Sequence, residues 1–324
     1  MMMIETRLTR AFGLEHPVIS APMAKAAGGR LAAAVTRAGG LGLIGGAYCD
    51  ADWISDQFAE AGNEAVGCGF ITWALAENPS VLAEVLARRP RAVFLSFGDP
   101  APFVPMVAEA GVPLVCQVQT LRDAKHAAGL GAAVIVAQGA EAGGHGEKRA
   151  TMTLVPEVAD WLARNYPETL LLAAGGIADG RGLAAALMLG ADGVLVGSRL
   201  WASDEALVHP NMWDAAVTAG GDDTIRSTVM DVARRLNWPA RYSCRVLKNA
   251  FTERWHGDLA GLIVAAEGEA AKWAAAWQAG DVSVANTFVG EAAGLIDAVR
   301  PAGEIVTGMV AEAEDLLGGG WRRV

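Results

Sequence analysis

Residues 169–198, TLLLAAGGIADGRGLAAALMLGADGVLVGS, contain the pattern that decides the fold. A β-rich apolar run at 169–174 is followed by a glycine turn, a helical pattern at 182–189 and a second apolar run at 193–197. Continuous apolar runs are typical of parallel strands that are buried on both faces. Gly190 follows the helical pattern, at a position where glycine supplies a left-handed C-cap. The stretch therefore predicts a strand, a helix and a second strand parallel to the first.

The same unit recurs through the first two-thirds of the chain. Further apolar runs precede this stretch, at residues 17–21, 41–45, 66–71, 92–97, 113–119 and 132–138. Helical patterns lie between several of them, at residues 29–38, 52–61, 79–89 and 121–128. Eight strands that alternate with helices over about 200 residues predict an α/β fold of the TIM (β/α)8 barrel type. The main alternative is a doubly wound sheet, which usually has fewer strands and a glycine-rich turn directly after the first.

After Arg199 the alternation of strands and helices stops. We expect a (β/α)8 barrel over residues 1–202 and a mainly helical C-terminal extension over residues 203–324, which packs on the barrel and partly completes it. Helical stretches are expected within residues 200–218, 241–253, 260–277 and 291–299, and residues 305–317 predict a closing helix. The part after Arg199 holds seven of the ten tryptophans and contains no linker-like segment, which favours a packed extension over a separate domain.

Charge and composition exclude several classes of protein. The 324-residue chain has a formal net charge of −10, which argues against a nucleic-acid binder because such a protein needs a basic face. The longest apolar runs are interrupted well before about 18 residues, so we expect no membrane span. Residues 1–12 carry Glu5, Arg7 and Arg10 and lack the apolar core of a secretory signal. The four cysteines have no metal-binding spacing, so we expect no metal site and a reduced, cytoplasmic protein.

In a barrel of this kind the active site lies at the carboxyl ends of the strands. Gly175 and Gly176 follow the seventh predicted strand, and Gly197 and Ser198 follow the eighth. Each pair leads into a helical pattern, so the backbone N–H groups of both turns can bind one phosphate. The simpler interpretation of each turn alone is that its glycines only permit a tight bend. The two turns together favour phosphate binding.

The turn after the sixth strand is the densest in candidate groups. Residues 138–146, QGAEAGGHG, place His145 among three glycines at the catalytic end of the barrel. Glycines let a loop pass close to a flat ligand, and an imidazole can donate a hydrogen bond or move a proton near neutral pH. We therefore expect a catalytic histidine on a loop. Glu141 is either a solvated carboxylate or a helix cap, and His256 reaches the site only if the extension folds over it.

Several motifs together resemble the nitronate monooxygenase family, formerly called 2-nitropropane dioxygenases. They are PVISAPM at 17–23, GGLG at 39–42, QGAEAGGH at 138–145, AAGGI at 173–177 and Gly-Ser at 197–198. Their order and spacing match the family from about residue 14 to residue 202, and EAGGH is the most specific element. Many members carry an asparagine on the third-strand turn, where this chain has Gly69 beside Cys68, with Thr72 nearby. That departure bears on the substrate rather than on the fold.

The resemblance implies a TIM barrel that holds non-covalent FMN. Carried over by position, the first-strand turn lines the flavin, Gln138 and Gly143 contact its ring system, and the two late glycine turns bind its phosphate. Together with the strand-end positions, the predicted cofactor-binding set is Ala21, Pro22, Met23, Gly69, Gln117, Gln138, Gly143, Gly144, Ala174, Gly175, Gly176, Gly197 and Ser198. His145 is the predicted catalytic residue.

The activity that this resemblance implies is the oxidation of alkyl nitronates with O2 to a carbonyl compound and nitrite. His145 would orient the nitronate oxygens or deprotonate a neutral nitroalkane. The expected partners are therefore a small nitronate or nitroalkane and O2, and a homo-oligomer is compatible with the sequence. Two alternatives remain. One is an FMN-dependent NAD(P)H reductase with an enoyl or quinone acceptor on the same scaffold, and the other is a non-catalytic flavin-binding barrel.

Overall fold

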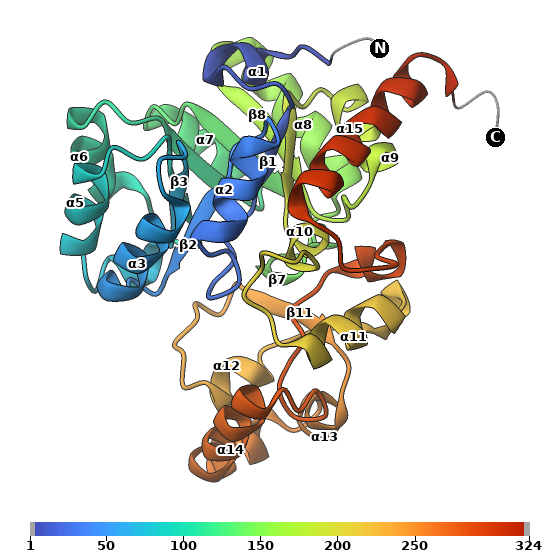
Figure 1. Cartoon of the computed structure of the whole chain (residues 1–324). Coiled ribbons are helices and arrows are strands. Elements are labelled where there is room, and N and C mark those ends of the chain that lie inside the picture. Colours follow the sequence, from blue (N-terminus) through green and yellow to red (C-terminus); the bar gives the residue numbers. More distant parts are fainter. Residues whose placement is uncertain (1–3, 321–324) are drawn as a thin grey trace.

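A computed structural model of the chain, which describes residues 4–320, contains the predicted barrel (Figure 1). Eight parallel strands form one sheet in the order β1-β9-β8-β6-β5-β4-β3-β2. They are β1 (Val18–Ser20), β2 (Leu43–Ala47), β3 (Gly67–Ile71), β4 (Val93–Ser96), β5 (Leu114–Val118), β6 (Val134–Gln138), β8 (Leu170–Ala174) and β9 (Gly193–Val196). A parallel bridge between Ile19 and Leu41 joins β1 to the chain just before β2, so the sheet is nearly closed. The prediction of a TIM barrel is confirmed, and each strand overlaps the apolar run that indicated it.

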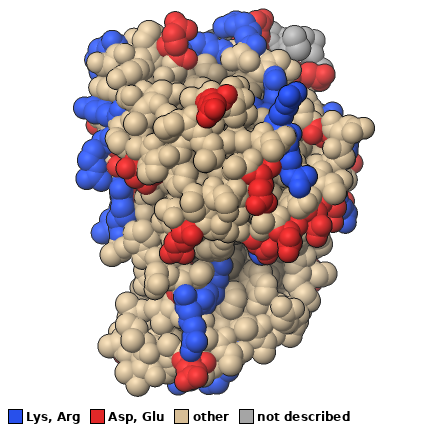
Figure 2. Space-filling view, turned by 90° about the vertical axis from the view of Figure 1, so that its left-hand side faces the viewer, with Lys and Arg blue, Asp and Glu red and all other residues tan. Residues whose placement is uncertain are grey.

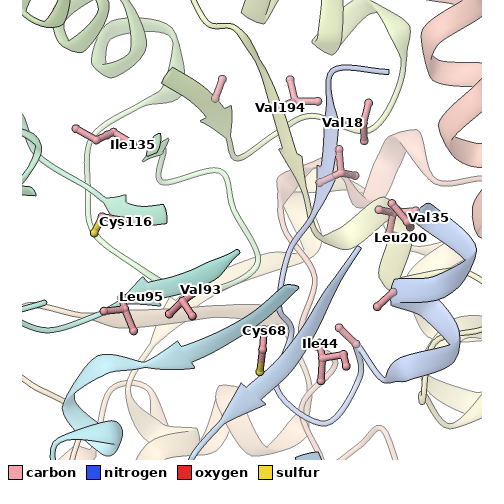
Figure 3. Close-up of a cluster of buried hydrophobic side chains, with 14 of the residues drawn as sticks. Val18, Val35, Ile44, Cys68, Val93, Leu95, Cys116, Ile135, Val194 and Leu200 are labelled. Atoms are coloured by element: carbon pink, nitrogen blue, oxygen red, sulfur yellow. The ribbon is translucent and has the colours of Figure 1, made fainter. Parts of the chain in front are cut away.

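Both faces of the barrel strands are buried, which explains their continuous apolar sequence. Ile19 and Leu43 belong to the buried cluster that fills the barrel interior. The adjacent residues Val18 and Ile44 belong to a second cluster, between the strands and the surrounding helices. Figure 3 draws part of this outer cluster, where strand side chains lie near Val35 of helix α2 (Gly29–Arg37). Because side chains alternate between faces along a strand, a strand that is covered on both sides is apolar throughout.

Helices surround the barrel, and the last described helix of the chain is one of them. After α2, the helices between the barrel strands are α3 (Ala51–Ala61), α4 (Thr72–Leu75), α5 (Ser80–Ala87), α6 (Val104–Glu109), α7 (Leu121–Gly129), α8 (Thr151–Asn165) and α9 (Gly180–Met188), with a short 3-10 helix η1 (Ala101–Phe103). Helix α1 (Arg7–Phe12) precedes β1. Helix α15 (Ala302–Leu317) packs against both α9 and α2, as Figure 1 shows, and it confirms the closing helix expected at residues 305–317. Gly180 permits this approach, because a Cβ atom there would lie 2.5 Å from the backbone nitrogen of Ala313.

The chain between β9 and α15 forms a second lobe beside the carboxyl ends of the barrel strands (Figure 1). Its helical elements are α10 (Ser198–Trp201), α11 (Pro210–Thr218), η2 (Gly221–Asp223), α12 (Val229–Ala233), α13 (Ala250–Trp255), α14 (Leu259–Ala279) and η3 (Glu291–Leu295). The lobe also contains an antiparallel sheet in the order β10-β11-β7, made by β10 (Thr224–Ser227), β11 (Ser243–Leu247) and β7 (Gly144–Gly146). The third of these strands comes from the barrel's sixth turn, so the sheet joins the lobe to the barrel.

Three expectations about local structure are corrected by this sheet and its surroundings. The helical stretch expected within residues 241–253 holds only for α13, because Ser243–Leu247 is strand β11. The helix expected over residues 200–218 is interrupted, because residues 202–209 lie outside α10 and α11. His145 lies in a strand rather than in an open loop, because pairing with β11 gives Gly144–Gly146 an extended conformation.

The surface adds two general facts. Figure 2 shows one face of the molecule, on which Lys and Arg side chains are intermingled with Asp and Glu over the barrel, while the lower lobe carries fewer charges. No helix within residues 4–320 combines the length and the apolar character that crossing a membrane requires.

Candidate active site

All of the predicted site residues lie around one cavity of about 450 Å³ at the carboxyl ends of the barrel strands. The barrel contributes the turns after β1, β3, β5, β6, β8 and β9. The lobe contributes a wall that the sequence-based set did not include, with Trp201, Met212, Arg234, Trp238, Trp273, Trp277 and Phe288. The roles assigned to the predicted residues remain predictions, but their convergence on one cavity makes those roles compatible with each other.

The two late glycine turns expose backbone N–H groups to this cavity. Gly175 and Gly176 have φ angles of +101° and +76°, a region that favours glycine. Within residues 4–320, the backbone N–H groups of Gly175, Gly176, Gly197 and Ser198 donate no hydrogen bond. Free N–H groups on two adjacent turns that line one cavity can bind an anion.

The cavity also offers open backbone where a flat ligand needs it. A Cβ atom at Gly144 would meet no atom within 4 Å, and one at Gly197 would find only Ala21 Cβ at 3.7 Å and Met23 Sδ at 4.0 Å. Glycine at these positions therefore leaves space that a side chain would fill. The free N–H groups and this space together fit a phosphate-bearing flat cofactor such as FMN.

Other glycines of the set serve packing within the protein. A Cβ atom at Gly69 would lie 2.4 Å from Pro22 Cγ, so Gly69 lets the first-strand turn approach β3. A Cβ atom at Gly143 would lie 2.6 Å from the backbone nitrogen of Gly290, so Gly143 lets the sixth turn contact the extension. Thr72 is buried, its Oγ1 has no hydrogen-bond partner among the described residues, and it does not line the cavity.

Glu141 is a helix cap. Its carboxylate accepts hydrogen bonds from the backbone N–H of Thr151 at 2.9 Å and from the hydroxyl of Thr151 at 2.9 Å. Thr151 is the first residue of α8, so the carboxylate satisfies a donor at the helix N-terminus. The structure thus decides between the two interpretations that the sequence left open.

The extension fastens the turn that carries His145. Arg226 of β10 and Arg245 of β11 both donate to the carbonyl oxygen of Ala140, through Nε at 3.1 Å and 3.0 Å respectively. Burial, which is the largest cause, and the nearby Arg245 lower the pKa of Arg226 to about 10, so this guanidinium is charged at neutral pH. Two cations on one carbonyl hold the turn in a single position.

Gln138 and Gln119 hold the same turn from the barrel side. The side-chain amide of Gln119 donates to Gln138 Oε1 at 2.8 Å, and Gln138 Nε2 donates to the carbonyl oxygen of His145 at 3.1 Å. All three residues are buried. The Gln138 amide is therefore already engaged with the protein, and it positions the strand that bears the histidine.

His145 is buried at the inner wall of the cavity and has two defined neighbours. Its Nε2 lies 3.0 Å from both carboxylate oxygens of Asp231 on α12. Its ring lies parallel to the Trp238 indole, with centroids 3.3 Å apart and an interplanar angle of 4°. Burial lowers the pKa of the His145 imidazole, although the hydrogen bond and charge of Asp231 oppose this effect. The imidazole is accordingly neutral at neutral pH.

Arg234 is a cation in the cavity wall that lacks an anionic partner. It caps the C-terminus of α12. Three aromatic rings surround its guanidinium carbon, with centroid distances of 5.4 Å for Phe288, 5.6 Å for Trp273 and 5.7 Å for Tyr48. Its guanidinium makes no hydrogen bond or ion pair with any described residue. An aromatic cage of this kind stabilises a cation while leaving its donors available.

The other histidines divide in a way that the sequence did not predict. His256 donates or accepts through Nδ1 to the hydroxyl of Ser227 at 2.9 Å and does not line the cavity. His209, which is not among the predicted site residues, does line the cavity at the start of α11. Asp231 and Trp238 were also missed, because no motif marks them and β10, β11 and β7 must pair before they meet His145.

Known proteins resemble this chain over nearly its whole length. The family profile described as nitronate monooxygenase matches residues 5–66 and 73–312, and the gap falls on β3 and the turn that departs from the family pattern. A nitronate monooxygenase of Neurospora crassa is 34% identical and covers 93% of this chain and 89% of its own length. A (3aS,4S,5R,7aS)-5-hydroxy-7a-methyl-1-oxo-octahydro-1H-indene-4-carboxyl-CoA dehydrogenase of Mycobacterium tuberculosis is 30% identical and covers 98% of this chain and 93% of its own. The solved structure of FabK from Thermotoga maritima has a TM-score of 0.85 at 29% identity and covers 99% of this chain and 100% of its own.

Proposed function

We propose that this chain, which belongs to the nitronate monooxygenase family and is a flavin-dependent oxidoreductase, binds FMN. We further propose that it oxidises alkyl nitronates with O2 to a carbonyl compound and nitrite. One observation carries this proposal. A buried neutral imidazole, an unpaired guanidinium and the free N–H groups of two glycine turns all line the same cavity. That combination suits a phosphate-bearing cofactor together with a small anionic substrate.

The cofactor would lie against the barrel turns. Gly175, Gly176, Gly197 and Ser198 would bind its phosphate through their backbone N–H groups. The turn at residues 21–23 and the open backbone at Gly144 would lie along its ring system. When bound, FMN supplies the redox chemistry that takes electrons from the nitronate and returns them to O2.

His145 would handle the nitro group. No hydrogen bond to Nδ1 exists within the described residues, and this atom is absent from the buried unpartnered atoms, so it retains accessible surface in the cavity wall. A neutral imidazole whose Nδ1 carries a lone pair can accept the α-proton of a neutral nitroalkane. The C–H electron pair then moves into the nitro group and gives the nitronate.

Arg234 would attract the nitronate anion. Its guanidinium lines the cavity without an ion-pair partner among the described residues, and three aromatic rings lie beside it. A cation in a partly dehydrated cavity attracts an anion more strongly than an exposed cation does. The aromatic wall of Trp201, Trp273 and Trp277 would accept the alkyl part of the substrate.

The test uses the purified protein and two substrates, nitroethane and its preformed nitronate. We expect a bound flavin that is identified as FMN after release, O2 uptake with the nitronate in the absence of NAD(P)H, and release of nitrite. His145→Asn should keep the flavin spectrum and lower nitroalkane turnover by roughly 10²-fold or more.

The alternatives predict different results. Rapid NAD(P)H oxidation with a quinone or enoyl acceptor, together with no nitronate turnover, would replace the proposal by a reductase. A flavin-loaded protein without either activity would indicate a binding protein. Protein that stays colourless after FMN is added would contradict all three.

A further inference from the structure

Asp231 and His145 are far apart in the sequence and meet through the antiparallel sheet. His145 lies on β7, opposite Cys244 of β11, and Asp231 lies on α12, which follows β10. Both side chains are almost fully buried, with 4% of Asp231 and 8% of His145 exposed. Both carboxylate oxygens of Asp231 lie 3.0 Å from Nε2 of His145. Because the pair is buried, water competes little for this contact.

The contact determines which nitrogen carries the proton. An ionised carboxylate can only accept hydrogen bonds, so Nε2 must donate to it. A neutral imidazole holds one proton, so Nδ1 is then the unprotonated nitrogen. Nδ1 has no hydrogen-bond partner among the described residues and is not a fully buried atom, and His145 lines the cavity, so the lone pair is available to a substrate there.

The ring plane is fixed by neighbours of its own. Trp238 covers one face of the imidazole, and its indole N–H donates to the hydroxyl of Tyr48 at 3.2 Å. The edge of Phe97 lies against the ring as well, with centroids 6.3 Å apart. Rotation of the imidazole out of this plane would break the parallel stack, and a half-turn within the plane would move Nε2 away from Asp231, so one orientation is preferred.

From these contacts we propose that Asp231 is a positioning residue that holds His145 as the Nε2–H tautomer and thereby makes Nδ1 the base that the cavity presents to substrate. The inference rests on the proposed function for the identity of the substrate, but the tautomer itself is a property of this chain. When Nδ1 takes the α-proton of a nitroalkane, the imidazole becomes a cation beside Asp231. The carboxylate then stabilises this charge in the place where solvent is excluded.

The charged and titratable groups around the pair shift the pKa of His145 in opposite directions. Arg226 of β10 and Arg234 at the end of α12 disfavour a second proton on His145, and burial does so more strongly. Asp231 is the group that favours it. Burial raises the pKa of the Cys244 thiol and of the Tyr48 phenol, so both stay neutral near pH 7. Removal of the Asp231 charge should therefore lower the pKa of His145 further.

The tautomer is tested first, by ¹⁵N NMR of holoprotein labelled at histidine. The five histidines are distinguished by the resonance that disappears in His145→Asn. We expect His145 to be protonated at Nε2 and unprotonated at Nδ1 in the wild-type protein. Asp231→Asn should weaken this preference, because its amide can donate to Nε2 as well as accept from it, and Asp231→Ala should lose the preference. A wild-type His145 that carries its proton on Nδ1 would overturn the inference.

Kinetics then test the role in proton transfer. Asp231→Asn should lower kcat/KM for neutral nitroethane by roughly 10²-fold and should lower kcat/KM for the preformed nitronate much less. The acid limb of the pH profile of kcat/KM for nitroethane should move to lower pH. Asp231→Glu should recover part of the rate. An equal loss with both substrates and an unmoved acid limb would contradict the positioning role.

Asp192→Asn is the matched control. Asp192 is also a buried carboxylate, but it pairs with Arg7 and accepts from the backbone N–H of Leu171 away from the cavity. Loss of the Asp192 charge should lower the stability of the protein. It should leave unchanged the His145 tautomer and the ratio of the kcat/KM values for nitroethane and its nitronate. If the wild-type tautomer is as expected while the holoprotein oxidises no nitronate, the positioning by Asp231 stands and the proposed function fails.

Discussion

The indole of Trp238 lies flat against the imidazole of His145, with ring centroids 3.3 Å apart and planes 4° from parallel. The first residue belongs to the segment after α12 and the second to the sixth turn of the barrel. Their contact is where the extension completes a site that the barrel begins. We therefore expect that loss of the Trp238 side chain lowers turnover but leaves FMN binding unchanged.

Trp238→Ala should lower nitroalkane turnover by on the order of 10- to 100-fold, because the His145 ring loses the surface that fixes its plane. FMN content should stay unchanged, since the phosphate turns lie on the barrel. Trp238→Phe should lose less, because a ring remains while the hydrogen bond to Tyr48 is lost. The matched control is Trp161→Phe, which alters a half-buried indole packed on Tyr166 outside the cavity. A similar loss in both variants would contradict the role of the stack.

Protonation of His145 should couple stability to pH. Burial lowers its pKa below the ordinary value near 6.5, so the unfolded chain binds the proton more readily than the folded protein does. Its contribution to stability is complete above about pH 6.5 and is lost as the pH falls toward the folded-state pKa. In urea unfolding from about pH 7.5 down to about pH 5, the free energy of unfolding should fall less steeply for His145→Asn than for the wild-type protein. His256→Asn controls for the removal of a histidine outside the cavity, and equal slopes in His145→Asn and wild type would oppose the assignment.

Gly176→Ala should weaken FMN binding by roughly tenfold, which corresponds to one charge-assisted hydrogen bond. The new Cβ would stand 3.3 Å from Glu141 Cβ at a φ of +76°, so the turn must shift and its N–H groups must move. Gly131→Ala is the control, because Gly131 has a similar φ of +85°, meets nothing within 4 Å and lies outside the cavity. Both variants should lose about 1 kcal/mol of stability. Equal FMN affinity in the two, measured by fluorescence titration, would place the phosphate elsewhere.

Arg234→Met should raise the KM for a nitronate by roughly tenfold, because the anion loses a cation of the cavity wall that has no ion-pair partner among the described residues, whereas Lys25 is paired with Asp50. The KM for the neutral nitroalkane should change much less. The control is Arg254→Met, which removes an exposed guanidinium that packs on Trp255 away from the cavity. In this variant the KM values for the nitronate and for the nitroalkane should both be unchanged. If the two substrates respond equally in Arg234→Met, the guanidinium contributes shape rather than charge.

The sequence alone was sufficient for the barrel and for most of the cavity lining that the barrel provides. Strands buried on both faces are continuously apolar, as in Leu170–Ala174, and a helix that ends before Gly190 is readable from local pattern. The site side of a (β/α)8 barrel follows from strand direction. For that reason the sequence alone places four residues of two turns together, namely Gly175, Gly176, Gly197 and Ser198.

The extension could not be read in the same way. Strand β11 alternates apolar and polar residues, with Arg245 facing the sixth turn, and its partner β7 is Gly-His-Gly, which has no β propensity. β11 gains its conformation by pairing with β10 and β7, and β7 gains its own only by pairing with β11 across about 100 residues of chain. That is why a helical stretch, and no strand, was expected within residues 241–253 and why His145 was expected on a loop.

What the sequence determined, then, is the fold and the set of barrel turns that surround the cavity, because both follow from patterns that repeat within about 30 residues. What only the tertiary structure decided is the state of His145. Its tautomer, its ring plane and its lowered pKa come from Asp231, Trp238 and burial. These groups act through contacts of a few ångströms between segments that are distant in the chain, and no local pattern records such contacts.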